Sequence, residues 1–269
     1  MSEPAVMEVL SGAPVLVVAF GGINHGIGIG VPPFEFLRSL SAQGCDAVFL
    51  RDVSQAWYQY GIDGVSTDVM GLAHWLEARR RGYRRTVAIG NSMGGYAALL
   101  FGCLAGFDLI IAFSPQTTIA LPDLSVLGDR RWQALIERGG LRSTDHRHHD
   151  VRNAMSRSGP ADQASLLFFG ASSREDRAHA MRLAGERGCH LFAVRDSQHQ
   201  AVRVLRDTGI LARLFGMICD PAVCLQAVLE DLRVDDRLTA AGGQPPVRAA
   251  EGGGPEPSRG AMPAGRRIE

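Results

Sequence analysis

The sequence predicts an α/β protein folded as a three-layer α/β/α sandwich with a mostly parallel central sheet. Three observations lead to this prediction. Six short apolar runs have the length of strands, segments with helical periodicity lie between them, and the 269 residues suit one large domain. Strands that alternate with helices along a chain pair in parallel, and the helices then cover both faces of the sheet.

The six apolar runs are nearly continuous and do not alternate with polar residues, which is typical of strands buried on both faces. Each is therefore assigned to the interior of the sheet, and the sixth is predicted to be the last strand. The predicted strands cover residues 14–20, 46–50, 86–90, 108–113, 165–170 and 190–194.

Three of the intervening segments carry clear helix boundaries. The segment 32–44, PPFEFLRSLSAQG, opens with proline and closes with glycine. The segments 68–82 and 174–188 have arginines near their carboxyl ends and also close with glycine. Proline in the first turn, and basic residues followed by glycine at the end, are favourable at those helix positions.

The strand and helix pattern places one α/β domain over residues 1–232. About residues 122–162 interrupt the alternation, because they contain helix-like pieces and no strand signal. An insertion of this length between two strands indicates a helical cap over a functional site. Residues 233–269 are rich in Gly, Pro and Ala without apolar periodicity, so we predict a disordered tail.

Composition excludes several kinds of chemistry. All 28 basic residues are arginine, so Schiff-base formation, attachment of pyridoxal phosphate and a P-loop lysine are excluded. The formal net charge is zero, which gives no electrostatic basis for binding nucleic acid. No cofactor is expected.

Cysteine usage and the amino-terminal sequence bear on location. The five cysteines are odd in number and lack C-x-x-C spacing, so they are expected to be buried thiols in a reducing compartment. The first residues, MSEPAVMEVLSG, contain neither a basic segment nor a long apolar run. We therefore expect a cytoplasmic protein with no membrane span, and the sequence leaves its oligomeric state open.

Residues 87–102, VAIGNSMGGYAALLFG, carry the most informative motif. Gly90, Ser92 and Gly94 have the G-x-S-x-G spacing of a nucleophile elbow, in which a tight turn from strand to helix exposes the serine hydroxyl. Such a turn crowds its neighbours, and glycine relieves that crowding. Alternatively, Ser92 caps a helix at an ordinary strand–helix junction, but this would not explain both glycines.

With this motif in its strand–turn–helix context, the chain resembles the α/β-hydrolase superfamily over about residues 14–218. The resemblance implies a catalytic triad in the order serine, acid, histidine, with the histidine after the last strand. His199 is the implied base because it lies in the loop after the run 190–194. His179 falls inside a predicted helix and His190 lies at the opposite end of its strand.

The triad acid is less clear. In the superfamily it follows the penultimate strand, but residues 171–173 of this chain are Ala, Ser and Ser. Asp176 is our first candidate, and Glu175 and Asp196 are the alternatives. Glu175 and Asp176 each follow a serine by three residues, so each also fits a capping box that only completes a helix terminus. A Ser–His dyad without an acid also stays open.

The resemblance also implies an oxyanion hole formed by two backbone N–H groups. Met93, directly after the serine, would supply one of them. The other would come from the glycine-rich loop after the first predicted strand, where Gly22 and Ile23 are the donors. The later glycines of this loop could instead belong to a dinucleotide fingerprint, but their spacing does not open directly into a helix and two prolines follow.

Residues that follow the other strands are candidates for substrate binding, because the carboxyl ends of parallel strands face the site. Arg51 could bind an anionic group, and Trp57 and Tyr58 could stack on a sugar or another ring. Gln116 would form another wall of the pocket. Alternatively, Arg51 pairs with Asp52 and the aromatic side chains pack under the loop.

The run 145–150, DHRHHD, contains side chains that suit zinc. Its histidines are too close in sequence to face one ion from a regular element, and no second cluster accompanies them. We predict a solvated segment of the cap and no metal.

Together these features predict a serine hydrolase that cleaves a carboxylic ester or thioester through an acyl-enzyme. An acyltransferase with a sugar or another alcohol as acceptor is the first alternative. A non-catalytic binding protein with the same fold is the second. A small-molecule or glycan-linked acyl compound would be the substrate.

Overall fold

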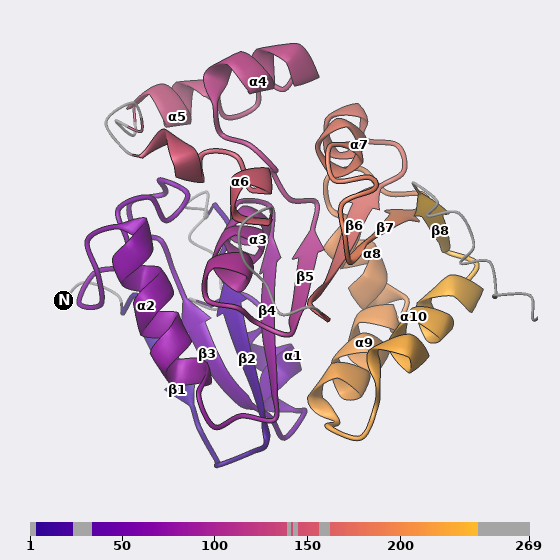
Figure 1. Cartoon of the computed structure of the whole chain (residues 1–269). Helices are drawn as coiled ribbons and strands as arrows, with labels where there is room; N and C mark the ends of the chain where they lie inside the picture. The colour runs from indigo at the N-terminus through magenta and orange to yellow at the C-terminus, as the bar shows by residue number, and fades with distance from the viewer. Residues whose placement is uncertain (1–3, 24–33, 139–140, 142–144, 156–161, 242–269) are drawn as a thin grey trace, which may run out of the picture.

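A computed structural model describes residues 4–23, 34–138, 141, 145–155 and 162–241 (Figure 1). Within this part of the chain an eight-stranded sheet has the order β1-β3-β2-β4-β5-β6-β7-β8. The six inner strands run parallel, and β1 and β8 lie antiparallel at the two edges. The strands are β1 Val6–Val9, β2 Val15–Phe20, β3 Asp46–Leu50, β4 Arg85–Asn91, β5 Leu109–Phe113, β6 Ala164–Gly170, β7 Cys189–Val194 and β8 Leu238–Ala241.

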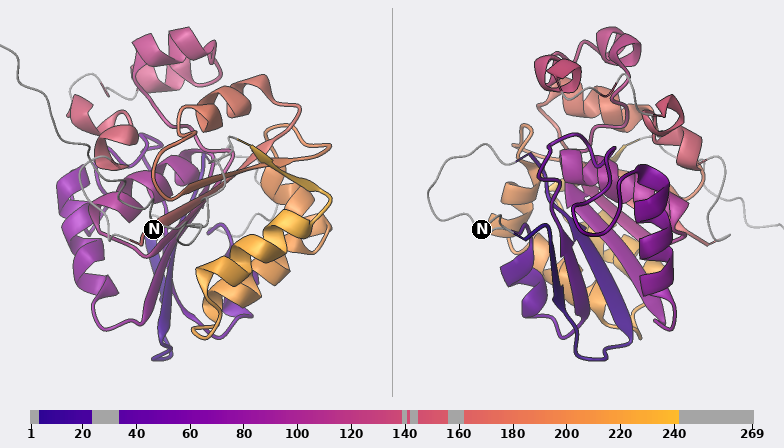
Figure 2. Two further views of the ribbon diagram at one scale, coloured as in Figure 1. Left: turned by 45° about the vertical axis from the view of Figure 1, so that its right-hand side comes forward. Right: turned by 90° about the vertical axis from the view of Figure 1, so that its left-hand side faces the viewer.

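Helices cover both faces of the sheet, and each face has its own apolar core (Figure 2). On one face α2, α3 and α7 contribute to the core, and on the other α1, α8, α9 and α10 do so. The result is the predicted three-layer α/β/α sandwich. These helices are α1 Leu37–Ser41, α2 Val69–Arg80, α3 Met93–Leu104, α7 Arg174–Met181, α8 Ala201–Asp207, α9 Ile210–Cys219 and α10 Leu225–Val234.

All six strands expected from the apolar runs are present, with bounds that differ by at most one residue at each end. Both edge strands, β1 and β8, were missed. Each has four residues and partly exposed side chains, so neither produces a continuous apolar run. The sheet therefore continues beyond β7, which corresponds to the strand predicted to be the last.

The domain boundary at residue 232 is also wrong. Arg233 and Val234 complete α10, and β8 pairs with β7 along Leu238–Ala241. Leu238 is buried in the core on that face, which explains why the chain returns to the sheet here. Of the predicted tail, residues 242–269 lie outside the described residues.

The insertion between β5 and β6 contains short helices joined by irregular segments in the part that the structure describes. It lies beyond the carboxyl ends of the strands, at the top of Figure 1, and α4 contacts α7. Its elements are α4 Leu121–Leu127, α5 Gln133–Arg138, the 3₁₀ helix η2 His146–His148 and α6 Arg152–Met155. Residues 139–140, 142–144 and 156–161 lie outside the described part.

The five cysteines are free thiols. Four are buried as expected, whereas Cys224 is exposed. Cys45 and Cys219 lie together, with 3.0 Å between their sulfur atoms. Among the described residues no helix combines the length and apolar character that crossing a membrane requires.

The assignment of β8 can be tested by substitution. We expect Leu238→Ala to lower the free energy of unfolding by about 2 kcal/mol, because it removes a buried side chain from the core under α10. Thr239→Ala, at an exposed neighbouring position, should change it by less than about 0.5 kcal/mol. Urea denaturation of both variants measures the difference. If Leu238→Ala were as stable as Thr239→Ala, a structural role for β8 would be contradicted.

Candidate active site

Ser92 lies on a strained turn between β4 and α3. Its backbone has φ 53° and ψ −117°, a combination that is rare for a residue with a side chain. A Cβ at Gly90 would lie 2.0 Å from the carbonyl oxygen of Gly94, and one at Gly94 would lie 2.1 Å from that of Phe20. The two glycines of the motif are thus required by close backbone approach. Ser92 makes no side-chain capping bond to α3, so the helix-cap interpretation fails.

His199 faces this serine from the loop after β7. The distance from His199 Nε2 to Ser92 Oγ is 3.1 Å. The loops after β6 and β7 are held together by a hydrogen bond from the Ser172 N–H to the Ser197 carbonyl, 3.0 Å long. Gly170 permits this contact, because a Cβ there would lie 2.0 Å from the Gln198 carbonyl oxygen. Glycine at the end of β6 therefore helps to place His199.

Asp176 is the carboxylate that binds His199. Its two oxygens lie 2.9 and 3.1 Å from His199 Nδ1, and its side chain is fully buried. The other two candidates, Glu175 and Asp196, are more exposed, and neither takes this position. Asp176 also stands in the first turn of α7, where its N–H donates to the Ser173 hydroxyl. The capping interaction and the contact with histidine therefore coexist.

The protonation state of this pair follows from its surroundings. Burial raises the pKa of the Asp176 carboxyl, but hydrogen bonds and charges from His199 and Arg131 outweigh burial and hold the pKa below its ordinary value. An ionised carboxylate accepts the Nδ1–H of the imidazole. The lone pair of Nε2 then faces the hydroxyl of Ser92, which is the arrangement that a general base needs.

The predicted oxyanion donors differ in their surroundings. Met93 is the first residue of α3, where backbone N–H groups have no partner within the helix. Gly22 is different, because its N–H donates to the carboxylate of Glu35. The structure thus engages Gly22 elsewhere and does not support it as an oxyanion donor. Ile23 is partly buried beside the core, and its role stays a prediction.

Sequence reasoning missed Glu35. Burial raises the pKa of its carboxyl to about 7, although hydrogen bonds from the Gly22 backbone and the Asn91 side chain oppose the rise. Its Oε2 is buried without a hydrogen-bond partner among the described residues. An acid between two phenylalanines in a predicted helix is the signal that could have identified it.

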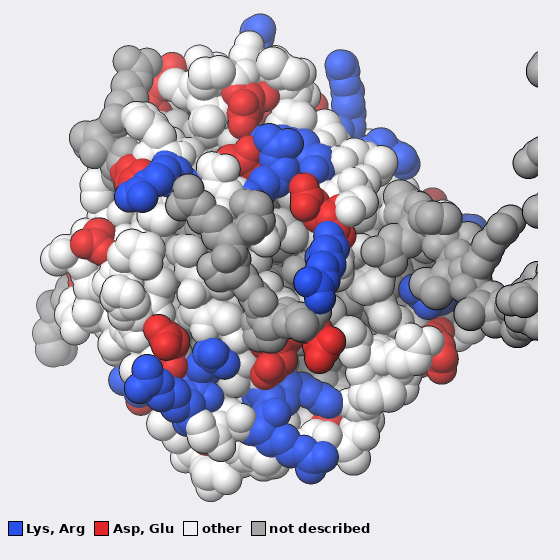
Figure 3. All heavy atoms as spheres, in the orientation of Figure 1, with Lys and Arg blue, Asp and Glu red and all other residues white. Residues whose placement is uncertain are grey.

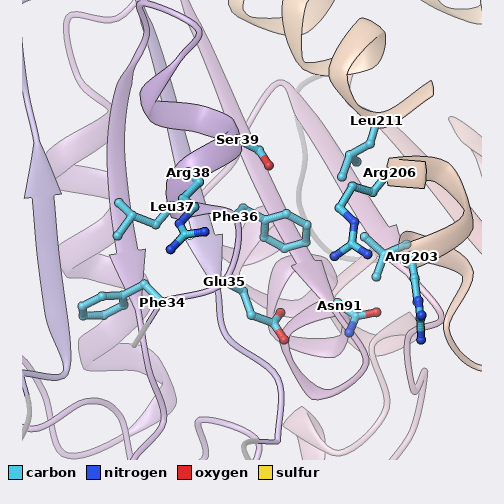
Figure 4. Close-up of a pocket in the computed structure, with 11 residues that line it drawn as sticks. Phe34, Glu35, Phe36, Leu37, Arg38, Ser39, Asn91, Arg203, Arg206 and Leu211 are labelled. Atoms are coloured by element: carbon cyan, nitrogen blue, oxygen red, sulfur yellow. The ribbon is translucent and has the colours of Figure 1, made fainter. Parts of the chain in front are cut away.

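Glu35 and Asn91 line a pocket of about 440 Å³ behind the serine turn (Figure 4). In Figure 4 the Phe36 ring lies between Arg38 of α1 and Arg206 of α8, with Glu35 and Asn91 below it. Over the face shown in Figure 3, acidic and basic side chains are interspersed and do not form one large basic field. The arginines that line the pocket are Arg38, Arg203 and Arg206.

Of the predicted substrate contacts, Gln116 lies at the site. Its Nε2 is 3.5 Å from Ser92 Oγ, and its Oε1 accepts a hydrogen bond of 3.3 Å from Trp57 Nε1. Trp57 and Tyr58 are fully buried. Tyr58 donates its hydroxyl to the Gly21 carbonyl and packs against Phe20. Neither ring has a free face for a sugar, so their prediction as stacking residues is wrong.

Arg51 places its guanidinium over the ring of Phe34. Its guanidinium carbon is 5.9 Å from the centre of the Phe34 ring, beside the segment that precedes α1. The Asp52 carboxylate accepts hydrogen bonds from the backbone N–H groups of Ala56 and Tyr58, at 2.7 and 2.8 Å. A substrate role for Arg51 stays a prediction.

The histidine-rich run forms a compact turn. His146 and His149 pack edge to face, with 3.3 Å between their Nδ1 atoms, so two of the histidines do meet despite their proximity in sequence. Among the described residues, no group of three or more His, Cys, Asp or Glu side chains is arranged to hold a metal ion.

The sequence matches no protein-family model and no curated protein. Solved structures show the fold. The capsule O-acetyltransferase of Neisseria meningitidis serogroup A is 13% identical over 77% of this chain and 90% of its own, with a TM-score of 0.53. A chain of the Glycosylation Associate Protein (Gap123) complex from Streptococcus agalactiae is 11% identical, with a TM-score of 0.53, and the match covers 78% of this chain and 45% of that one.

A third solved structure is MGS-MChE2, an alpha/beta hydrolase enzyme from the metagenome of lagoon sediments of Mar Chica in Morocco. It is 14% identical over 80% of this chain and 96% of its own, with a TM-score of 0.48. The chain has an α/β-hydrolase-like fold. The TM-scores of 0.53 indicate a shared fold, and identities of 11–13% give no evidence for a shared substrate.

The packing at the serine turn predicts the effect of one methyl group. Gly94→Ala should lower the free energy of unfolding by about 1–3 kcal/mol, because the new Cβ meets the backbone of β2. Gly216→Ala in α9 is the control, since its Cβ would make only an ordinary contact, 3.7 Å from Gln43. Thermal and urea unfolding compare the two. A Gly94→Ala protein as stable as the control would contradict the close approach of α3 to β2.

The buried carboxyl of Glu35 predicts a pH-dependent stability. Its pKa is about 7 in the folded protein and near 4.5 in the unfolded chain, so between these values the folded state holds a proton that the unfolded state has lost. Raising the pH from 5 to 8 should therefore destabilise the wild type, relative to Glu35→Gln, by up to about 3 kcal/mol. Urea unfolding at both pH values measures this. If the difference in unfolding free energy between wild type and Glu35→Gln were the same at both pH values, Glu35 could not hold the extra proton of the folded state.

Proposed function

We propose that the protein is a serine hydrolase that cleaves a carboxylic ester or thioester through an acyl-enzyme. The observation that carries this proposal is the hydrogen-bonded chain from Ser92 through His199 to the buried Asp176. It begins at a hydroxyl on a strained turn and ends at a carboxylate whose pKa is held low. Nucleophile, base and orienting acid in this order are the components of nucleophilic acyl transfer.

In the first half of the proposed reaction, His199 Nε2 takes the proton of Ser92 as Oγ attacks the carbonyl carbon. The N–H of Met93 donates to the developing oxyanion, and Asp176 stabilises the imidazolium. The imidazolium then protonates the leaving alcohol or thiol as its bond to the carbonyl carbon breaks. The product is an ester of Ser92.

In the second half, an acceptor attacks this ester while His199 removes the acceptor's proton, and Ser92 regains its own. Water as the acceptor gives hydrolysis. An alcohol as the acceptor gives acyl transfer, and the likeness to a capsule O-acetyltransferase makes a sugar hydroxyl worth testing. A small-molecule or glycan-linked acyl compound remains the proposed substrate.

Covalent labelling tests the nucleophile. A fluorophosphonate should add one adduct to the wild type, on the peptide that contains Ser92, because the neighbouring imidazole activates that hydroxyl. Ser92→Ala should not be labelled, and Ser39→Ala, at a serine of α1, should be labelled like the wild type. Intact and peptide mass spectrometry detect the adduct. A folded wild type that resists labelling would favour a non-catalytic binding protein.

The acid is tested by turnover. Asp176→Asn should lower kcat by about 10⁴-fold, because an amide in place of the carboxylate no longer holds the required imidazole tautomer. Glu175→Gln, one position earlier on α7, should retain most of the activity. Hydrolysis of p-nitrophenyl esters of increasing chain length, with and without added sugar or glycerol, measures both variants and separates hydrolysis from transfer. Full activity of Asp176→Asn would exclude Asp176 as the acid.

A further inference from the structure

We propose that Arg131 of the insertion is a positioning residue for the triad acid, so that the insertion forms part of the catalytic apparatus and is not a separable cover. This inference rests on the proposed function. It comes from contacts that join Arg131 to both Asp176 and His199 across 45 and 68 residues of sequence.

The first contact is with the carboxylate of Asp176. Arg131 Nη1 donates to Asp176 Oδ1 over 2.8 Å, and His199 Nδ1 lies 2.9 Å from the same oxygen. Nη1 is itself 3.1 Å from His199 Nδ1. Both nitrogens are donors when the imidazole serves as base, so they share the oxygen and do not bond to each other. Arg131 thus fixes the oxygen that orients the imidazole.

Arg131 is in turn held by Asp129. Its Nε and backbone N–H both donate to Asp129 Oδ1 at 3.0 Å, and its Nη2 donates to Oδ2 at 2.8 Å. The Asp129 side chain is almost fully buried, with 2% of its surface exposed. A bidentate contact of this kind fixes the plane of the guanidinium as well as its position.

Asp129 is anchored to the same helix that carries the triad acid. His179 Nε2 lies 3.1 Å from Asp129 Oδ2, and His179 Nδ1 accepts the backbone N–H of Thr117 over 3.0 Å. This second bond requires the proton of His179 to be on Nε2, where it is donated to Asp129. His179 and Asp176 are three residues apart and so share one face of α7. The segment with Asp129 and Arg131 therefore bridges two positions on that face.

The charges of this network favour the proposed chemistry. Asp129 and Asp176 carry two negative charges at a buried site, and Arg131 carries one positive charge. One negative charge remains, which protonation of His199 would neutralise. Without Arg131 the two carboxylates would keep their hydrogen bonds to His179 and His199 but lose the cation that both of them bind, and two such negative charges are costly in a buried site. The pair of Asp176 and His199 would then take up a proton more readily.

A second arginine provides a natural control. Arg182, directly after α7, bonds to Asp123 of α4 at 2.9 Å and to Asp150 near α6 at 2.7 Å. It fastens the insertion to α7 as Arg131 does, but it does not touch the triad residues through any of these bonds. Loss of Arg182 should therefore weaken the same interface without altering the environment of Asp176.

The experiment compares Arg131→Ala with Arg182→Ala and with Arg130→Ala at an exposed neighbouring position. For Arg131→Ala we expect a fall in kcat for p-nitrophenyl acetate of about 10²-fold, since the imidazole loses its alignment. KM should change little. The acid limb of kcat/KM should move upward by about one pH unit, because a positive charge that opposes proton uptake has gone. Guanidinium at non-denaturing concentration should restore part of the activity.

Arg182→Ala and Arg130→Ala should leave the pH profile in place and should not respond to guanidinium. If Arg131→Ala unfolds, Asp129→Asn provides a milder variant and should move kcat and the acid limb in the same directions by smaller amounts. Arg131→Ala with the kcat and pH profile of the wild type would overturn the proposal. Equal changes in Arg182→Ala would also overturn it, because the insertion would then act only through its attachment.

These outcomes separate the inference from the proposed function. A wild type that neither labels with a fluorophosphonate nor cleaves esters would refute the function itself. A wild type that does both would uphold the function. If Arg131→Ala then had the kcat and pH profile of the wild type, only the role of Arg131 would be refuted. The rate of fluorophosphonate labelling adds a measurement of Ser92 reactivity that does not depend on the choice of ester.

Discussion

The burial of one carboxylate, that of Asp176, constrains the whole functional end of the molecule. A buried negative charge is costly unless charges and hydrogen bonds compensate it. His199 and Arg131 supply that compensation from opposite directions along the chain, one from the loop after β7 and the other from the insertion. The position of the insertion and the position of His199 are therefore both tied to the carboxylate of Asp176.

The sheet brings these groups together through its register. The strands β4, β5, β6 and β7 are consecutive neighbours and parallel, so the segments that follow them leave the same edge. Each segment contributes one component: Ser92 after β4, Gln116 after β5, Asp176 after β6 and His199 after β7. Glycines at the ends of β4 and β6 allow these segments to approach one another more closely than residues with a Cβ could. Backbone packing thus brings these segments to one edge of the sheet, and the side-chain contacts among Ser92, His199 and Asp176 then fix the distances within the site.

The sequence predicted the parts of this arrangement that are local. Ser92 and His199 stand at fixed places relative to apolar strands, and strands buried on both faces are easy to recognise. The aromatic residues after β3 were misjudged because residues after a strand can point either into the core or toward the site, and local pattern does not separate these cases. The edge strands were not predicted because two of the four residues in each are exposed and interrupt any apolar run. Arg131 could not be found from sequence, because its partner Asp176 is 45 residues away and nothing in the pattern of either segment indicates the pairing.

Asp176 illustrates how two interpretations of a motif can both describe the same residue. Ser173 does cap α7, as a capping box predicts, and its hydroxyl accepts the N–H of Asp176. That capping bond uses the backbone of Asp176 and leaves its carboxylate free to bind His199. Placement in the first turn also puts the negative charge near the positive end of the helix, which favours the ionised form. Asp176 in the first turn of α7 thus has a fixed backbone, but its buried carboxylate needs a cation, and Arg131 of the insertion provides it.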